Sequence, residues 1–292
     1  MKKRVIILGS TGSIGKSTLE VIANQPDDFE IVGIACGVNT ELFTDQIRRF
    51  QPRFACLFNE DLKDRVDFAS ARRLVGPRGL KDLIEAEADI VVNALPGSVG
   101  LESSIDALKQ NRVLALANKE SLVMAGRFIK NLINEGHGSL IPVDSEHSAV
   151  YQLLEGIGRP DIEKLVITAS GGPFRNHSKD ELSSVTPDQA LCHPTWNMGR
   201  KVTIDSATFM NKALELIEAH WLFDVHQSKI GVLVHPESVV HGMVQCVDGS
   251  FFAYLANPDM KIPIAYVDLE KGSPKGFHLV VIKLKQAKVL AK

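Results

Sequence analysis

The chain has 292 residues, 45% of them hydrophobic, and a formal net charge of −2. This length suffices for two packed domains, and the near-neutral charge excludes the broad basic surface with which proteins bind nucleic acid or anionic membranes. No apolar run reaches the ~18 residues of a membrane span, and the run Val5–Leu8 is too short for the core of a signal peptide. The four cysteines form no C-x-x-C pair and fit a reducing cytosol, so we expect a soluble cytoplasmic protein that binds no nucleic acid and no membrane.

The first half of the chain alternates short apolar runs with helical patterns, which predicts successive βαβ units. The expected strands are Arg4–Leu8, Glu30–Cys36, Phe54–Leu57, Ile90–Asn93, Val113–Leu116 and Ser139–Val143. The expected helices are Ile14–Asn24, Glu41–Phe50, Leu80–Ala86, Leu101–Gln110 and Ser121–Glu135. Because the strands are nearly continuous apolar runs, they are typical of a parallel sheet that is buried on both faces. We therefore predict an α/β chain in which residues 1–143 form a Rossmann-like domain with a mostly parallel sheet.

The second half is organised differently. A strand at Leu165–Thr168 is followed by a glycine-rich turn and a long polar stretch to Arg200, and a helix is expected at about Thr208–Phe223. Three further runs are typical of strands: Ile230–Val234, Val239–Val247 and Ser250–Leu255. Strands that follow one another without helices predict an antiparallel or mixed sheet. We expect an α+β domain over residues 144–266, followed by an atypical tail over residues 267–292.

The loop Gly9–Gly15 follows the first expected strand and opens the first expected helix. Its glycines let the backbone turn tightly and approach a pyrophosphate, to which the amides at the helix start then donate. The alternative is an ordinary turn between a strand and a helix. The end of the second strand has no acid to bind a ribose hydroxyl, which favours NADP over NAD. Val38 supplies no cation for a 2′-phosphate, so we expect a reduced preference for NADP.

Asp144 and Glu146 follow the expected strand Ser139–Val143. Residues two apart on an extended backbone point to the same side, so both carboxylates can face one point. Such hard oxygen ligands suit Mg²⁺ or Mn²⁺. The alternative is a helix that begins near His147, capped by Asp144 or Ser145 and with an acid in its first turn. The spacing alone leaves both interpretations open.

The stretch His193–Lys201 combines His, Trp, Met and two cations in a segment with little strand or helix periodicity. One interpretation is a mobile lid that covers a substrate and excludes water. The alternative is a structured surface loop in which Trp196 packs inward.

The helix expected at Thr208–Phe223 carries polar residues beside its apolar stripe. At its start, Ser206, Asn211 and Lys212 can bind a phosphate, and Glu215 can reach a nearby metal. The alternative is a capped amphipathic helix with solvated polar side chains. Glu218 lies on the same face, so helix geometry does not choose between Glu215 and Glu218.

Several strings of the sequence together resemble one family. They are Gly9–Gly15, Ala117–Leu122, Pro142–Ala149, Thr168–Gly172, His193–Phe223 and Asn257–Met260. The family is that of 1-deoxy-D-xylulose 5-phosphate reductoisomerase, from non-mevalonate isoprenoid biosynthesis. The resemblance covers Lys3 to Tyr266, and the family then continues into a helical C-terminal domain that this chain is expected to lack. Val267–Lys292 is instead a Lys-rich tail with a turn followed by Phe277–Leu284, and this tail is either a replacement strand or the product of truncation or frameshift.

The resemblance implies a role for each matching residue. It implies a metal site of Asp144, Glu146 and Glu215, which favours Glu215 over Glu218, and it adds Lys119 to these three as the catalytic set. The implied cofactor-binding residues are Gly9, Thr11, Gly12, Ser13, Ile14, Gly15, Gly37, Val38, Asn39, Asn118, Glu120 and Gly199, with Val38 standing where the family usually has a basic residue. The implied substrate-binding residues are Lys119, Ser145, Glu146, Ser170, His193, Trp196, Met198, Ser206, Asn211, Lys212 and Glu215, with Trp196 and Met198 in the flexible loop.

The resemblance also implies the reaction. In the family, Mg²⁺ or Mn²⁺ chelates the ketone and a neighbouring hydroxyl of the sugar phosphate 1-deoxy-D-xylulose 5-phosphate, whose carbon skeleton then rearranges to an aldehyde. NADPH reduces this aldehyde to 2-C-methyl-D-erythritol 4-phosphate, and Lys119 mediates proton transfer or stabilises charge. A homodimer through the central sheet is implied as well. Two alternatives stay open: an inactive cofactor-binding remnant, and a metal-free NADP-dependent dehydrogenase on the same scaffold.

Overall fold

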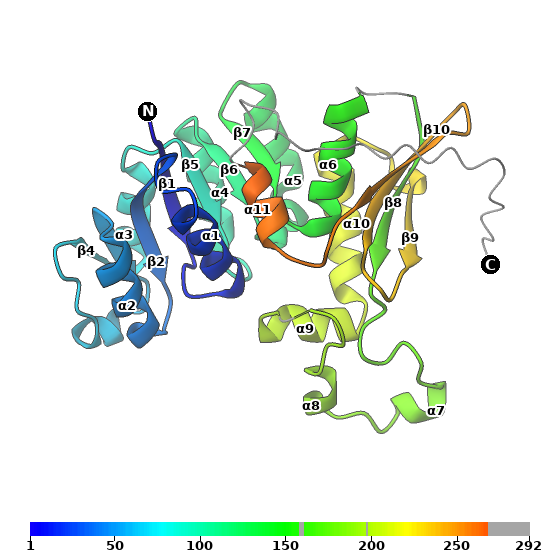
Figure 1. The fold of residues 1–292 in the computed structure, drawn as a ribbon, viewed down its shortest axis with the longest axis horizontal. Coiled ribbons are helices and arrows are strands. Elements are labelled where there is room, and N and C mark those ends of the chain that lie inside the picture. The colour runs from blue at the N-terminus through cyan, green and yellow to red at the C-terminus, as the bar shows by residue number, and fades with distance from the viewer. Residues whose placement is uncertain (158–160, 197, 268–292) are drawn as a thin grey trace. The chain divides into compact units, whose positions relative to one another are not determined.

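The computed structural model describes residues 1–157, 161–196 and 198–267. The chain divides into two compact units, Met1–Asp144 with the segment that begins at Met260, and Ser145–Asp259. Figure 1 labels most of their elements. The tail element expected at Phe277–Leu284 lies outside the described residues. Within the described part of the chain, no helix combines the length and the apolar character that crossing a bilayer requires.

The first unit is built on a seven-stranded sheet in the order β4-β3-β2-β1-β5-β6-β7. Its strands are β1 (Lys3–Leu8), β2 (Phe29–Cys36), β3 (Phe54–Leu57), β4 (Arg72–Val75), β5 (Ile90–Asn93), β6 (Val113–Leu116) and β7 (Ser139–Pro142). All neighbouring strands are parallel, which confirms the predicted Rossmann-like α/β class. The strand order reverses between β1 and β5, and ligands of such sheets bind outside the carboxyl ends of the strands at this switch point.

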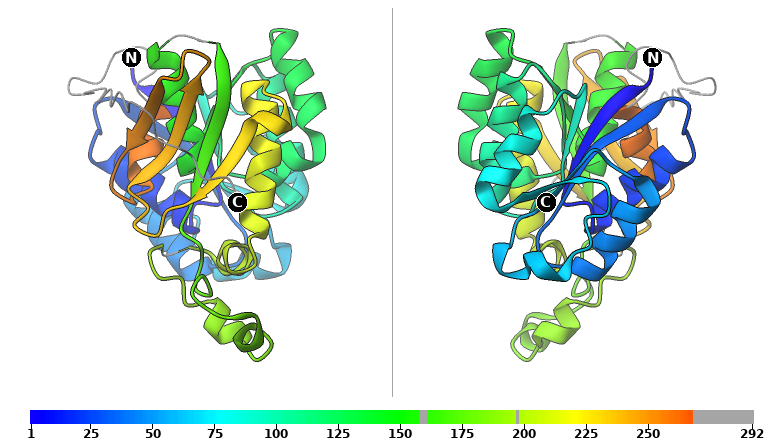
Figure 2. Two further views of the ribbon diagram at one scale, coloured as in Figure 1. Left: turned by 90° about the vertical axis from the view of Figure 1, so that its right-hand side faces the viewer. Right: turned by 90° about the vertical axis from the view of Figure 1, so that its left-hand side faces the viewer.

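Helices cover both faces of this sheet, as the right-hand view of Figure 2 shows. Side chains of α1 (Ser13–Ala23) and α2 (Thr40–Phe50) join those of β1 and β2 in one hydrophobic core. On the other face, α4 (Val99–Lys109) packs between α3 (Gly76–Glu85) and α5 (Lys119–Asn134). A short 3-10 helix, η1 (Glu60–Arg65), lies between β3 and β4. Burial from both sides explains why the strands are continuous apolar runs.

Helix α11 (Lys261–Val267) also belongs to the first unit. Lys261 Nζ lies 2.7 Å from Glu20 Oε2 of α1, and Ile264 and Val267 are buried in the core that contains α1. The observed division after Asp144 lies one residue from the expected 143/144 boundary. The C-terminal end of the expected second domain is different. That domain, residues 144–266, was expected to include nearly all of α11, which the structure assigns to the first unit. The chain therefore returns to the first unit, a step that no local sequence pattern indicates.

The second unit contains a four-stranded sheet in the order β11-β10-β8-β9. Its strands are β8 (Ile162–Ala169), β9 (Ile230–Val234), β10 (Val240–Cys246) and β11 (Phe251–Leu255). β10 is antiparallel to β8 and β11, whereas β8 and β9 are parallel, which confirms the predicted mixed sheet. The two helices α6 (Ser145–Ile157) and α10 (Met210–Phe223) share one hydrophobic core with this sheet. In the left-hand view of Figure 2, α6 lies behind the strands.

Short helices fill the polar stretch between β8 and α10. They are α7 (Lys179–Leu182), α8 (Pro187–Ala190) and α9 (Arg200–Ala207), and a 3-10 turn, η2 (Gln227–Lys229), follows α10. Sequence analysis did not predict α9, because Thr203 is its only buried residue and it therefore has no apolar stripe. Phe209 separates α9 from α10 in a left-handed conformation with φ of 59°, which is uncommon for a residue of its size.

Candidate active site

The loop Gly9–Gly15 lies between β1 and α1, at the switch point of the first sheet. Gly9 has φ of 85°, and a Cβ placed on it would lie 2.7 Å from the Ala94 carbonyl oxygen. A Cβ on Gly15 would collide with the Gly9 carbonyl oxygen. Only glycine fits both positions, so the loop folds tightly, and Gly12 and Ser13 stay exposed at the start of α1. The free amides of a helix start in this position are suited to a pyrophosphate.

The end of β2 lies beside this loop, because Thr11 Oγ1 is 3.3 Å from Cys36 Sγ. Val38 follows with 68% of its surface exposed. Asn39 caps α2, since its Oδ1 accepts from the Leu42 amide at 3.2 Å. The three positions 37–39 thus stand where a Rossmann fold presents the second strand to an adenosine ribose, and Val38 offers neither an acid nor a cation there.

Asn118, expected to contact the cofactor, is held by the protein itself. Its Nδ2 donates to the carbonyls of Leu95 at 2.7 Å and Gly97 at 2.8 Å. Its Oδ1 accepts from the Ser121 amide at 3.0 Å and so caps α5. A Cβ on Gly100 would collide with this side chain at 2.5 Å. Asn118 therefore fixes the loop after β5 to the start of α5, beside Glu120.

Lys119 and Asp144 form an ion pair within the first unit. Lys119 is buried, and its Nζ donates to Asp144 Oδ2 at 2.7 Å. Lys119 begins α5, which follows β6, and Asp144 follows β7, so both lie beyond the carboxyl ends of neighbouring strands. The pair stabilises a carboxylate in a largely buried position.

Glu146, Lys212 and Glu215 form a second charged group, within the second unit. Lys212 Nζ donates to Glu146 Oε1 at 2.7 Å and also to Glu215 Oε2. Asn211 Nδ2 donates to the other oxygen of Glu215, and Ser145 Oγ donates to Glu146 Oε2 at 2.5 Å. Burial by itself would lower the pKa of Lys212, but the two carboxylates outweigh it and raise that pKa.

Three carboxylates come together where α6 begins. Asp144 is bonded directly to Ser145, and one oxygen each of Asp144, Glu146 and Glu215 lies within 4.8 Å of the others. This all-oxygen set fits Mg²⁺ or Mn²⁺. The expected alternative, a helix start with an acid in its first turn, is also present, since α6 begins at Ser145. The helix start and the grouping of acids therefore coexist.

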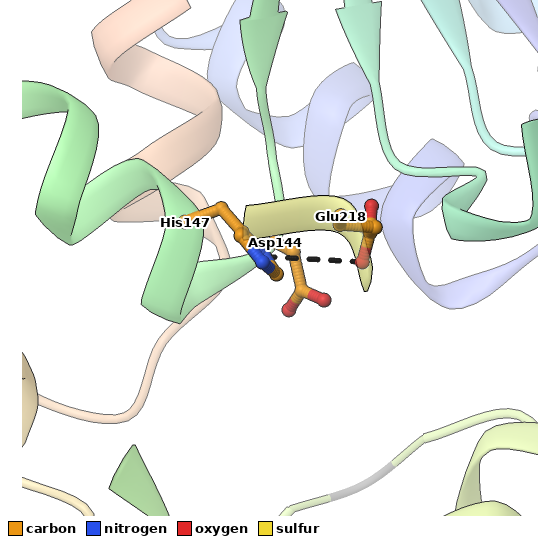
Figure 3. Close-up of side chains that lie close together, drawn as sticks. All are labelled: Asp144, His147 and Glu218. Carbon is orange, nitrogen blue, oxygen red and sulfur yellow. Dashed lines mark ion pairs between the residues drawn. The ribbon is translucent and has the colours of Figure 1, made fainter. Parts of the chain in front are cut away.

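Glu218 lies one turn after Glu215 on α10 and is also buried, at 3% exposure. Its Oε2 lies 3.9 Å from Nδ1 of the buried His147, and Figure 3 shows these two side chains with Asp144. His147 Nε2 lies 2.9 Å from the Glu215 carbonyl oxygen, so this nitrogen carries the proton and donates it. His147 thus joins α6 to the backbone of Glu215. Sequence reasoning used His147 only to mark a helix start, because nothing in its spacing indicates this bond.

His193 and Ser170 form a polar pair near the glycine-rich turn. His193 Nδ1 accepts from the amides of Thr195 at 3.2 Å and Trp196 at 2.9 Å. Its Nε2 therefore carries the proton and donates to Ser170 Oγ at 2.9 Å. Burial, with a smaller contribution from Arg175, lowers the pKa of His193 and favours this neutral form. Sequence analysis did not identify Arg175.

Within the His193–Lys201 stretch, Trp196 packs against β10 of the second unit. Trp196 is half-buried, with its ring 6.1 Å from the His241 ring, and Gly199 caps α9. This packing agrees with the surface-loop interpretation for Trp196 as it stands, while closure over a ligand stays a prediction. The backbone of Ser206 lies close to the glycine-rich turn. A Cβ on Gly172 would lie only 2.8 Å from the Ser206 carbonyl oxygen.

The fold and its glycine loop define the class of Rossmann-type, dinucleotide-dependent enzymes. Within that class, residues 5–126 match the family model described as 1-deoxy-D-xylulose 5-phosphate reductoisomerase, and residues 140–223 match the model of that family's C-terminal domain. The chain belongs to the 1-deoxy-D-xylulose 5-phosphate reductoisomerase family.

Individual relatives agree with this assignment. The chain is 48% identical, over 272 residues, to the 1-deoxy-D-xylulose 5-phosphate reductoisomerase of Thermoanaerobacter sp. strain X514, and the match covers 90% of this chain and 70% of the relative. It is 49% identical over 273 residues to the enzyme of that name from Geobacter metallireducens, with the same coverage. The chain thus spans about 70% of the length of these relatives.

Solved structures of the family share both the fold and a substantial part of the sequence. A crystal structure of DOX-P reductoisomerase with NADPH, fosmidomycin and magnesium superposes with a TM-score of 0.85 at 37% identity, covering 97% of this chain and 72% of that one. The Zymomonas mobilis enzyme in complex with NADPH gives a TM-score of 0.84 at 37% identity, covering 98% of this chain and 74% of that one.

Proposed function

We propose that this chain converts 1-deoxy-D-xylulose 5-phosphate to 2-C-methyl-D-erythritol 4-phosphate with NADPH and Mg²⁺ or Mn²⁺. Membership of the family and the complexes of its relatives with NADPH and magnesium support this function. The observation that carries it is the grouping of Asp144, Glu146 and Glu215 within 4.8 Å. A metal-free dehydrogenase has no use for three grouped carboxylates, whose mutual repulsion the two ammonium groups of Lys119 and Lys212 only partly balance.

In this proposal the three carboxylates hold the metal, which when bound polarises the substrate's oxygens as a Lewis acid. Lys119, which reaches Asp144 at 2.7 Å, then lies close enough to the metal ligands to stabilise charge or move a proton. The neutral His193 donates a hydrogen bond and orients the substrate together with Ser170. The further substrate-binding residues in the proposal are Ser145, Trp196, Met198, Ser206, Asn211 and Lys212.

The proposed cofactor site is the glycine loop with the end of β2. NADPH supplies the hydride, and the loop Gly9–Gly15 holds its pyrophosphate against the start of α1. Because Val38 is exposed and uncharged, we propose that the chain prefers NADPH by a smaller margin than relatives with a cation there. Gly37, Asn39, Asn118, Glu120 and Gly199 complete the proposed contacts, with Asn39 and Asn118 acting through the loops that they fix.

The test is an assay of the purified chain for NADPH oxidation that depends on 1-deoxy-D-xylulose 5-phosphate, with and without a chelator. We expect oxidation that stops in the chelator and returns with Mg²⁺ or Mn²⁺. Undiminished oxidation in the chelator would favour a metal-free dehydrogenase. NADPH binding without any oxidation would favour an inactive cofactor-binding remnant.

We further propose that two copies of the chain associate through the edge of the second sheet. β9 is an edge strand of that sheet, and its residues Val232, Leu233 and Val234 are 40%, 48% and 47% exposed. An exposed apolar edge strand is a template for pairing with another chain. Light scattering should give the mass of a dimer for the wild type and of a monomer for Leu233→Lys. A wild type that is monomeric at all concentrations would contradict the proposal.

The location is a separate proposal. Cys36, Cys56, Cys192 and Cys246 are all free thiols, which fits a reducing compartment, and we propose that the protein acts in the cytoplasm. Fractionation of the source cells, followed by detection of the chain, tests this location directly.

A further inference from the structure

Lys212 is an unusual lysine, because it is only 6% exposed and lies between two acids. Its Nζ donates to Glu146 Oε1 at 2.7 Å, to Glu215 Oε2 and to the carbonyl oxygen of Thr168. An ammonium group has three hydrogens to donate, and here three acceptors receive them. Lys212 is therefore fully engaged inside the protein.

These three hydrogen bonds leave Lys212 no donor with which to bind a substrate phosphate directly. All three donors are in use, so the ammonium can contact a substrate phosphate only after it leaves at least one acceptor. Two of these acceptors, Glu146 and Glu215, are carboxylates of the proposed metal site. The ammonium thus neutralises part of the charge that a divalent metal would otherwise neutralise.

We propose that Lys212 is the resident cation of the metal site, which holds Glu146 and Glu215 together before the metal binds and is displaced when Mg²⁺ or Mn²⁺ arrives. The displaced ammonium then becomes available to the substrate phosphate. Metal binding and substrate binding are thereby coupled through one side chain. This inference rests on the proposed metal site, and it assigns to Lys212 a role that precedes its contact with substrate.

The distances in the site allow an estimate of how much the Lys212 ammonium weakens metal binding. Mg²⁺ binds oxygen at about 2.0–2.1 Å, and Nζ lies 2.7 Å from Glu146 Oε1. A metal on that oxygen would therefore lie within about 5 Å of the present Nζ position, the sum of these two distances. A single positive charge held so close to a double one would weaken metal binding by about tenfold even if the surroundings screen as strongly as water, and this repulsion favours displacement of the ammonium. Removing the charge of Lys212 should accordingly strengthen metal binding by about tenfold.

The test measures Mn²⁺ affinity by calorimetry for the full chain, without NADPH or substrate. Lys212→Met removes the charge and keeps most of the stem, whereas Lys212→Arg keeps the charge. Lys229→Met is a matched control, because Lys229 Nζ binds the Ile162 carbonyl at 2.9 Å, at the other end of β8 from Thr168. We expect Lys212→Met to bind Mn²⁺ about tenfold more tightly than the wild type. Lys212→Arg and Lys229→Met should stay within about threefold of the wild type.

An affinity of Lys212→Met equal to or weaker than that of the wild type would overturn the proposal. A second measurement covers the case in which Lys212→Met does not fold: a crystal structure of the wild type with Mn²⁺ alone. We expect Nζ to have left Glu146, Glu215 or both, and an ammonium still bound to both beside the metal would also overturn the proposal. Failure of the wild type to bind Mn²⁺ is a different result, because it refutes the metal site on which the inference rests.

Discussion

Glu215 and Glu218 offer a matched pair of buried acids, one turn apart on the same helix. Glu215 is 0% exposed and Glu218 is 3% exposed, so a change to glutamine removes a buried charge and keeps the shape at either position. If Glu215 is a metal ligand and Glu218 is not, only Glu215→Gln should weaken metal binding. The pair therefore separates the three-carboxylate site from a merely acidic helix face.

The expected magnitudes follow from the contacts of each side chain. Outer-shell partners of metal ligands are typically worth 10–100-fold in affinity, so loss of a direct ligand should weaken Mn²⁺ binding by at least about 100-fold, or about 2.7 kcal/mol. When Glu215 is changed, Lys212 still has Glu146 as a partner at 2.7 Å, so the change should cost only about 1–3 kcal/mol of folding stability, less than orphaning a buried charge. Glu218→Gln should leave Mn²⁺ affinity within about threefold of the wild type.

The assay is calorimetric titration with Mn²⁺, beside fluorescence titration with NADPH. Asp144→Asn and Glu146→Gln should behave like Glu215→Gln, and turnover of all three should fall by orders of magnitude. NADPH affinity should survive in every variant. Glu146, Glu215 and Glu218 belong to the other unit from Gly9–Gly15, and Asp144 follows β7, which is separated from β1 by two strands of the first sheet. If Glu215→Gln binds Mn²⁺ as Glu218→Gln does while Asp144→Asn does not bind it, the three-carboxylate site is wrong.

Three further predictions concern the cofactor loop and the His193–Lys201 stretch. Val38→Arg should strengthen NADPH binding about tenfold through a charge-assisted contact and leave NADH binding unchanged; a better affinity for NADH than for NADPH in the wild type would contradict the NADP assignment. Gly15→Ala should weaken NADPH binding at least about tenfold, because its Cβ collides with the Gly9 carbonyl oxygen, while Mn²⁺ affinity, measured as the control, stays unchanged. In a Trp221→Phe background, the emission of Trp196 should shift when cofactor and substrate bind, as the ring leaves His241; an emission that saturating ligand does not change would support the surface-loop interpretation.

Three strands of the first sheet that sequence predicted to the residue are almost wholly buried. Phe54–Leu57, Ile90–Asn93 and Val113–Leu116 begin and end where the pattern placed them, because a strand covered on both faces must be apolar throughout. β4 was not predicted, because its residues Arg72 and Arg73 are exposed on an edge strand. An edge strand is stabilised by its neighbour rather than by its own pattern, so its sequence carries a weaker signal.

Some residues of the site can be predicted from their spacing along the chain, whereas others depend on contacts between distant segments. The spacing of Asp144 and Glu146 is local, and it indicated that two acids could face one point. The position of Glu215 depends on how α10 packs on α6, and only the resemblance to a family supplied it. The engagement of Lys212 by Glu146 joins residues 66 positions apart, and no spacing or periodicity reports such a contact.

The partners of the two acids on α10 explain why a metal should choose between them. Glu215 has an ammonium and an amide at its two oxygens, and the group that it forms with Asp144 and Glu146 offers oxygen ligands alone. Glu218 belongs to a second group, with Asp144 and His147, which offers an imidazole nitrogen. Mg²⁺ and Mn²⁺ prefer carboxylate oxygen, whereas imidazole suits zinc, copper and nickel.

His147 is also bound through Nε2 to the Glu215 carbonyl, so its ring holds the backbone of Glu215 in place while its other nitrogen faces Glu218. A hard divalent ion should therefore select Glu215, with His147 holding the backbone behind that ligand.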